Sequence, residues 1–188
     1  IQQRVRAWME VHGYRDLPAI YFLLNPLYVR EEGAVESFLD TLEDADIWPG
    51  LIVLDTLSRS FGGGEENSSA DMGLFMERII HLAKGRRMAL LVVHHMNAMG
   101  SRERGHTSFR GNLDTLFKCE AAKSDTGLVL RVDVKNDKQK DGIEQPTVSM
   151  SPIQDVKLSL VFEACDTPVP KRKGAGIPAV MRKADMLQ

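Results

Sequence analysis

The chain has 188 residues, of which 43% are hydrophobic and 27% are charged, a balance that is ordinary for one soluble globular domain. Its formal net charge of -2 excludes a basic character of the whole chain, so any contact with nucleic acid has to come from a local basic patch. No apolar run approaches the roughly 20 residues that a membrane-spanning helix needs, and no secretory signal is present. We therefore predict a cytoplasmic protein without membrane contact.

The first half of the chain alternates helical and strand-like patterns. Apolar residues recur at helical spacing in three segments, which are residues 1–12, 35–42 and 71–84. Continuous apolar runs that are typical of buried strands occur at residues 19–24, 51–54 and 88–93. The strand–helix–strand order predicts a parallel sheet that is flanked by helices.

The third helical segment carries the clearest signals. Asp71 stands where an N-cap residue is expected, because its carboxylate can accept a hydrogen bond from the first free backbone N–H groups. The face that we expect to point into the core carries Met72, Leu74, Phe75, Ile79, Ile80 and Leu82.

The second half of the chain has the pattern of antiparallel strands. Strand-like segments occur at residues 116–121, 127–135, 147–150 and 158–162. We expect them to extend the edge of the parallel sheet, which gives an α/β fold with a mostly parallel sheet and antiparallel edge strands. Residues 1–165 would form this core, and residues 166–188 would form a basic flexible tail, because five basic residues and one acidic residue lie between Thr167 and Gln188.

A carboxylate closes one of the predicted buried strands. Asp55 follows the apolar run Leu51–Leu54, which places it at the carboxyl end of the strand. In open α/β sheets that edge faces the ligand crevice, and a carboxylate there can hold the water shell of Mg²⁺. An aspartate that merely caps a strand end into a turn fits the same pattern, so this signal alone decides nothing.

The next predicted strand ends in a pair of histidines. His94 and His95 follow the apolar run 88–93, one β-α-β unit after Asp55. Adjacent parallel strands would bring Asp55 and His95 to the same edge, where the histidine could sense a γ-phosphate. Two unrelated histidines are the alternative. Zinc ligation is disfavoured because no Cys/His/acid cluster with ligand spacing accompanies them.

Taken together, these motifs resemble the RepA-like branch of RecA-fold ATPases, which includes plasmid hexameric helicases and many phage replication ATPases. The resemblance extends over roughly residues 1–152, and it is carried by residues 4–8, 51–57, 61–67, 71–73, 92–95, 104–114 and 138–142. It implies a RecA-like core in which Asp55 is the Walker B acid and Mg²⁺ ligand. Thr56 would lie beside Asp55 in the nucleotide site, and His95 would be the sensor of the third helicase motif.

The resemblance also implies a DNA-facing loop over residues 96–110. Four residues of this segment, Arg102, Arg104, His106 and Arg110, are candidates for contacts with the phosphates of single-stranded DNA. A solvated surface loop would have the same composition and remains the alternative.

Two lysines form the last candidate group. Lys138 and Lys140 are two residues apart, so in an extended segment they project to the same side. Similar RecA-fold helicases use such a pair to reach the ATP of the neighbouring subunit, where positive charge stabilises the transferring phosphoryl group. Lysine at position 140 keeps the charge but loses the bidentate fork of the more usual arginine. A charged hairpin tip is the alternative.

One element of the resemblance is missing. These 188 residues contain no G-x-x-x-x-G-K-[ST] motif, and acids follow Gly62–Gly64 where Lys-Ser would be required. In similar proteins the P-loop and a glutamate base precede the helix at residues 1–12, so we expect this chain to be a partial domain that hydrolyses negligible ATP alone.

The sequence therefore predicts part of an ATP-dependent, DNA-acting motor that uses ATP and Mg²⁺ and assembles as a homo-oligomeric ring. A catalytically inactive RecA-like module for oligomerisation or partner binding is the main alternative. A recombinase-like ATPase without helicase action is the other.

Overall fold

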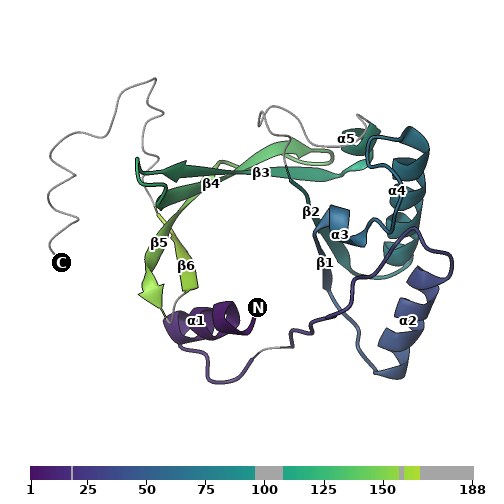
Figure 1. Ribbon diagram of the computed structural model, residues 1–188, viewed down its shortest axis with the longest axis horizontal. Helices are drawn as coiled ribbons and strands as arrows, with labels where there is room; N and C mark the ends of the chain where they lie inside the picture. Colours follow the sequence, from purple (N-terminus) through teal and green to yellow (C-terminus); the bar gives the residue numbers. More distant parts are fainter. Residues whose placement is uncertain (18, 96–107, 157–158, 166–188) are drawn as a thin grey trace, which may run out of the picture. The chain divides into compact units, whose positions relative to one another are not determined.

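The computed structural model describes residues 1–17, 19–95, 108–156 and 159–165, and it has mixed α/β structure (Figure 1). The described residues fall into two compact units. Unit 1 takes its described residues from 1–16, 117–137 and 143–165, and unit 2 takes them from 17–116 and 138–142. The predicted tail, residues 166–188, lies outside the described part of the chain, so the predicted division into 1–165 and 166–188 stays a prediction.

Unit 2 contains a parallel pair of strands and most of the helices. Its elements are α2 (Ala34–Asp44), β1 (Leu51–Asp55), α3 (Leu57–Ser60), α4 (Ser69–Ala83), β2 (Ala89–Val93) and α5 (Ser108–Asn112). The two strands pair in parallel, with Leu51 opposite Ala89 and Asp55 opposite Val93. The predicted strand–helix–strand unit is confirmed here, because α4 connects β1 to the neighbouring strand in the same direction.

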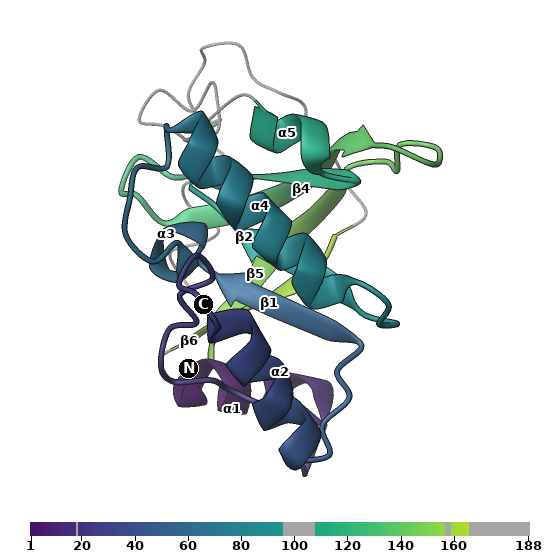
Figure 2. The ribbon, with the colours of Figure 1, turned by 90° about the vertical axis from the view of Figure 1, so that its right-hand side faces the viewer.

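The core of unit 2 lies on one face of this strand pair. Figures 1 and 2 show α2 and α4 on the same side of β1, and α4 packs against both α2 and β2. Leu54 is buried in this core, and Ile52, Leu90 and Val92 pack against it. The side chains that alternate with them point to the opposite face and are exposed; they are Leu51, Val53, Leu91 and Val93. The prediction of strands buried on both faces is therefore wrong for this outer face.

Helix α4 forms as predicted but begins with a different cap. Ser68 is the N-cap residue, and its side chain accepts a hydrogen bond from the backbone N–H of Asp71 at 3.3 Å. Asp71 lies inside the first turn and is not the cap. The buried side of the helix carries Met72, Phe75, Met76, Ile79 and Leu82. Ile80, which we expected on this side, is 54% exposed, because the covered stripe turns toward Met76.

The apolar run at residues 19–24 is not a strand, contrary to the prediction. Its residues have neither helical nor strand conformation, and Leu24 is 81% exposed. An apolar run forms a strand only where a neighbouring edge accepts its backbone hydrogen bonds, and β1 pairs only with β2 among the described residues.

Unit 1 is built on antiparallel strands and one helix. The strand order is β3 (Thr115–Lys123), β4 (Val129–Gln139), β5 (Val148–Val156) and β6 (Ser159–Ala164), and the first residues of β3 and the last of β4 belong to unit 2. Helix α1 (Gln2–His12) packs against β6 and ends at Gly13, whose left-handed backbone (φ 71°) is the predicted helix stop. All four predicted strands are confirmed. They form a sheet of their own, however, so the described residues do not show one mostly parallel sheet.

Candidate functional site

The register of β1 and β2 brings the predicted Walker B acid and the predicted sensor to one edge. Asp55 is the last residue of β1 and lies opposite Val93, the last residue of β2. His94 and His95 follow Val93 directly, so the carboxylate and the histidines leave the same carboxyl edge of the strand pair. This is the edge where open α/β sheets bind ligands.

Asp55 is positioned by buried neighbours while its own side chain is exposed. Leu54 before it is 6% exposed and Leu57 after it is fully buried, so both sides of Asp55 are anchored in the core of unit 2. Thr56 is the N-cap residue of α3 and accepts a backbone hydrogen bond from Ser60 at 3.1 Å. The peptide bond between Asp55 and Thr56 is cis. Among the described residues, no side chain or backbone group forms a hydrogen bond or ion pair with the carboxylate of Asp55, so this carboxylate is available to a ligand.

A single carboxylate such as that of Asp55 suits Mg²⁺, which keeps several waters, better than a metal ion that needs several protein ligands. The described part of the chain contains no group of three or more His, Cys, Asp or Glu residues that could enclose a metal. Mg²⁺ usually keeps several waters and takes one or two carboxylates together with substrate phosphates. A single exposed aspartate meets that requirement.

The glycine-rich loop after α3 is fixed by an arginine that the sequence analysis missed. Arg30 forms an ion pair with Asp71 and donates a hydrogen bond to the carbonyl oxygen of Gly63. Its guanidinium lies 4.9 Å from the ring centre of Phe61. Asp71 also accepts a hydrogen bond from the backbone N–H of Glu65 at 3.0 Å.

Three glycines in a row were the sequence signal for this arrangement. Gly62, Gly63 and Gly64 all have positive φ, between 74° and 75°, a conformation that other residues rarely adopt. The loop can therefore wrap closely around the Arg30–Asp71 pair. Gly62 comes seven residues after Asp55, the last residue of β1, so this pair fixes the chain that leaves the candidate edge.

Lys138 and Lys140 are in different environments. The ammonium of Lys138 donates to the carbonyl oxygens of Arg110, Gly111 and Leu113, at 2.8, 3.2 and 2.6 Å. Lys140 lies 3.4 Å from a carboxylate oxygen of Asp114, and its side chain is 60% exposed. The prediction that both lysines serve a neighbouring subunit is not tested by one chain.

Only one of the four predicted DNA contacts falls within the described residues. Arg110 lies in α5 and is half-buried. Arg102, Arg104 and His106 lie outside the described part of the chain, so their predicted role stays a prediction.

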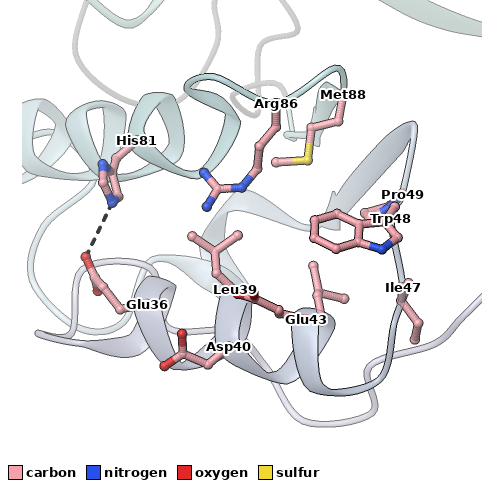
Figure 3. A pocket seen from close by; sticks show the side chains of 11 residues that line it. Glu36, Leu39, Asp40, Glu43, Ile47, Trp48, Pro49, His81, Arg86 and Met88 are labelled. Atoms are coloured by element: carbon pink, nitrogen blue, oxygen red, sulfur yellow. Dashed lines mark ion pairs between the residues drawn. The ribbon is translucent and has the colours of Figure 1, made fainter.

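A hollow of about 270 Å³ lies at the other end of unit 2 (Figure 3). Trp48 and Pro49 line it just before β1, and Met88 lines it just before β2, so the hollow is at the amino edge of the strand pair. Figure 3 shows the side chains of Glu36 and His81 facing each other at this hollow, with Glu36 Oε1 and His81 Nε2 3.7 Å apart. Its place at the end opposite Asp55 separates it from the predicted nucleotide site.

A comparison with known protein families gives one match. A family described as AAA domain matches residues 1–101, which is more than half of the chain. The chain belongs to this family. The matched region includes Asp55 and His95 and ends before Lys138. No curated protein matches the chain.

Membership of the AAA domain family supports a nucleotide-dependent ATPase activity at a general level, and such ATPases usually use ATP and Mg²⁺. The AAA-type family is consistent with the resemblance to RecA-like helicases, without selecting the RepA-like branch. None of the described helices has the length and apolar character that crossing a bilayer requires.

Proposed function

We propose that this chain is part of a RecA-like, ATP-dependent motor of the RepA-like branch, which acts on single-stranded DNA and assembles as a homo-oligomeric ring. The observation that supports this proposal most directly is the parallel register of β1 and β2. In this register Asp55 and Val93, which precedes His95 by two residues, end their strands at one edge, and this supports the roles of Walker B acid and phosphate sensor for Asp55 and His95. The AAA domain match supports the ATPase part of the proposal.

In this proposal each residue at the edge has a separate role. Asp55 holds the water shell of Mg²⁺, which neutralises the charge that develops on the transferring phosphates. Thr56 lies beside it in the nucleotide site, and His95 senses the γ-phosphate. Arg102, Arg104, His106 and Arg110 contact the DNA backbone. A lysine from the 138–140 segment adds positive charge at the nucleotide of the adjacent subunit.

Replacement of Asp55 tests the ATPase part. We expect Asp55→Asn to lower kcat by about 100-fold or more, because the substitution removes the negative charge that holds Mg²⁺. Turnover is measured with and without single-stranded DNA, on the protein expressed from the complete coding sequence that contains these residues. Asp40→Asn is the matched control, since Asp40 lies on α2 beside the hollow at the opposite edge. Equal turnover in the two variants would contradict the assignment of Asp55.

An interaction module without catalysis is the second candidate function. It is favoured by the exposed outer face of the strand pair, where Leu51, Val53, Leu91 and Val93 lie side by side at the surface. Contiguous apolar surface of this kind marks contact sites in soluble proteins. Nucleotide binding that is undetectable with Mg²⁺ present, in the protein from the complete coding sequence, would favour this candidate over the motor.

A further inference from the structure

Lys138 and Lys140, at the end of β4, differ in how many hydrogen-bond acceptors surround their ammonium groups. A lysine ammonium has three N–H donors and no acceptor. In Lys138 all three donors have a backbone carbonyl within hydrogen-bond distance. Among the described residues, the ammonium of Lys140 contacts the exposed carboxylate of Asp114 alone, at 3.4 Å.

The three acceptors of Lys138 lie at the C-terminal end of α5. The last carbonyl groups of a helix have no partner within the helix, so they need an external donor. Arg110 and Gly111 are the third and fourth of the five residues of α5, and Leu113 follows one residue after its end. A cation at this position also interacts favourably with the negative end of the helix. Lys138 therefore caps α5 from a strand that is 25 or more residues away in sequence.

Neighbouring contacts hold the same two segments together. The backbone N–H of Lys140 donates to the carbonyl oxygen of Asp114 at 2.8 Å. The hydroxyl of Thr115 donates to the side-chain oxygen of Gln139 at 3.1 Å. All of these residues belong to unit 2, so the contacts are made within one compact body. The side chain of Lys138 lies between three carbonyl groups and is only partly exposed.

From these contacts we infer that Lys138 and Lys140 have different functions. Lys138 is a positioning residue that fixes the C-terminal end of α5 and, through it, Arg110. Lys140 is the lysine that is left to act outside its own subunit. This inference rests on the proposed function for the DNA contact of Arg110. It also assigns the contact with the neighbouring subunit to Lys140 alone, because three carbonyl groups would lose their donor if the side chain of Lys138 left α5.

Hydrogen exchange in the full 188-residue chain tests the anchor without DNA, ATP or a neighbouring subunit. We expect the backbone amides of residues 108–115 to exchange about tenfold faster in Lys138→Met than in the wild type, because three charge-assisted hydrogen bonds are lost. Lys140→Met is the matched control, and we expect less than about a twofold change there, because its ion pair is exposed. Equal exchange in the two variants would overturn the inference.

A second substitution guards against loss of folding in Lys138→Met. Lys138→Arg keeps the positive charge, but its planar fork cannot direct three N–H groups to three carbonyls around one point. We expect exchange between that of the wild type and that of Lys138→Met. Wild-type protection in Lys138→Arg would show that charge alone matters and would count against the anchor.

DNA binding shows whether the anchor acts through Arg110. Affinity for a labelled oligothymidylate is measured as a function of salt for Lys138→Met, Arg110→Gln and the double variant. We expect each single variant to reduce the slope of log K against log salt by about one, because one phosphate contact is lost. The double variant should show no further reduction, whereas Lys140→Met combined with Arg110→Gln should be additive. A change in overall stability alone would not produce this coupling.

The outcomes separate this inference from the proposed function. Additive effects of Lys138→Met and Arg110→Gln would overturn the positioning role while leaving the DNA contact of Arg110 in place. Unchanged DNA affinity in Arg110→Gln would count against the proposed DNA contact. In that case accelerated exchange in Lys138→Met would still support the assignment of Lys138 to α5 rather than to a neighbouring nucleotide.

Discussion

The two faces of the β1–β2 pair have nearly the same composition and opposite surroundings. On the inner face, Leu54 is 6% exposed and lies in the core with Phe75 and Leu57. On the outer face, Leu51 is 52% exposed although it belongs to the same strand and is the same residue type. The difference arises from the helices: α2 and α4 lie on the same side of the pair, and within unit 2 the described residues include no layer on the other side. Apolar composition therefore shows that a face can be buried, and it does not show what buries it.

The largest effect that we expect separates these two leucines. Leu54→Ala should lower the free energy of unfolding by about 2–5 kcal/mol, because it leaves a cavity in a closed core. Leu51→Ala should cost less than about 1 kcal/mol, because half of the side chain is already in contact with water. Urea unfolding followed by circular dichroism measures both. Equal losses of stability in the two variants would mean that the outer face of the strand pair is covered in solution, contrary to the exposure of Leu51.

The same contrast explains which parts of the fold the sequence could predict. Periodicity located α2 and α4, because each helix has a covered side and an open side, and strand-like runs located the four strands β3 to β6. The prediction of a strand at residues 19–24 was wrong, because an apolar run in a sequence does not show whether a neighbouring strand edge is available to pair with it. Periodicity also assigned Ile80 to the core in place of Met76. The sequence shows that α4 has an apolar side, but the exact residues on the buried side depend on where the neighbouring elements pack.

A smaller difference in stability is expected between alanine substitutions at two glycines, one with close neighbours and one in open space. Gly62 and Gly85 have nearly equal positive φ, 74° and 73°. A Cβ atom at Gly62 would lie 2.9 Å from Cβ of Tyr28, whereas at Gly85 it would meet nothing within 4 Å. The Tyr28 segment cannot move away easily, because the neighbouring Val29 donates a backbone hydrogen bond to Ser60 at 2.9 Å.

We therefore expect Gly85→Ala to cost about 1–2 kcal/mol for the left-handed backbone alone. Gly62→Ala should cost about 1–3 kcal/mol more, because the added methyl group overlaps Tyr28. Thermal or urea unfolding of both variants, with the wild type as reference, gives the difference directly. Equal losses would mean that the loop after α3 can shift away from Tyr28, and that the Arg30–Asp71 pair does not hold it in place.

The sequence could predict those parts of the candidate site that lie at the ends of strands. Asp55 and His95 could be assigned to one edge because residues that follow neighbouring parallel strands meet there, and the register agrees. Arg30 was not predictable, since its partners Asp71 and Gly63 are distant in sequence and only the run of three glycines hinted at a close approach. The difference between Lys138 and Lys140 was not predictable either, because alternation along a strand places both on the same side without showing what each one meets.

The smallest effect concerns the outer face itself. Val53 and Leu91 are 49% and 44% exposed, and Val53 lies opposite Leu91 in the strand register. Replacing both with threonine, which strands accommodate well, should change the free energy of unfolding by less than about 0.5 kcal/mol per site. It should also reduce the binding of a hydrophobic dye, because it removes apolar surface from water. Sedimentation velocity shows whether the wild-type chain associates and whether the double variant does so less. A loss of more than about 1 kcal/mol per site, without any change in association, would show that this face is covered within the chain and is not a contact surface.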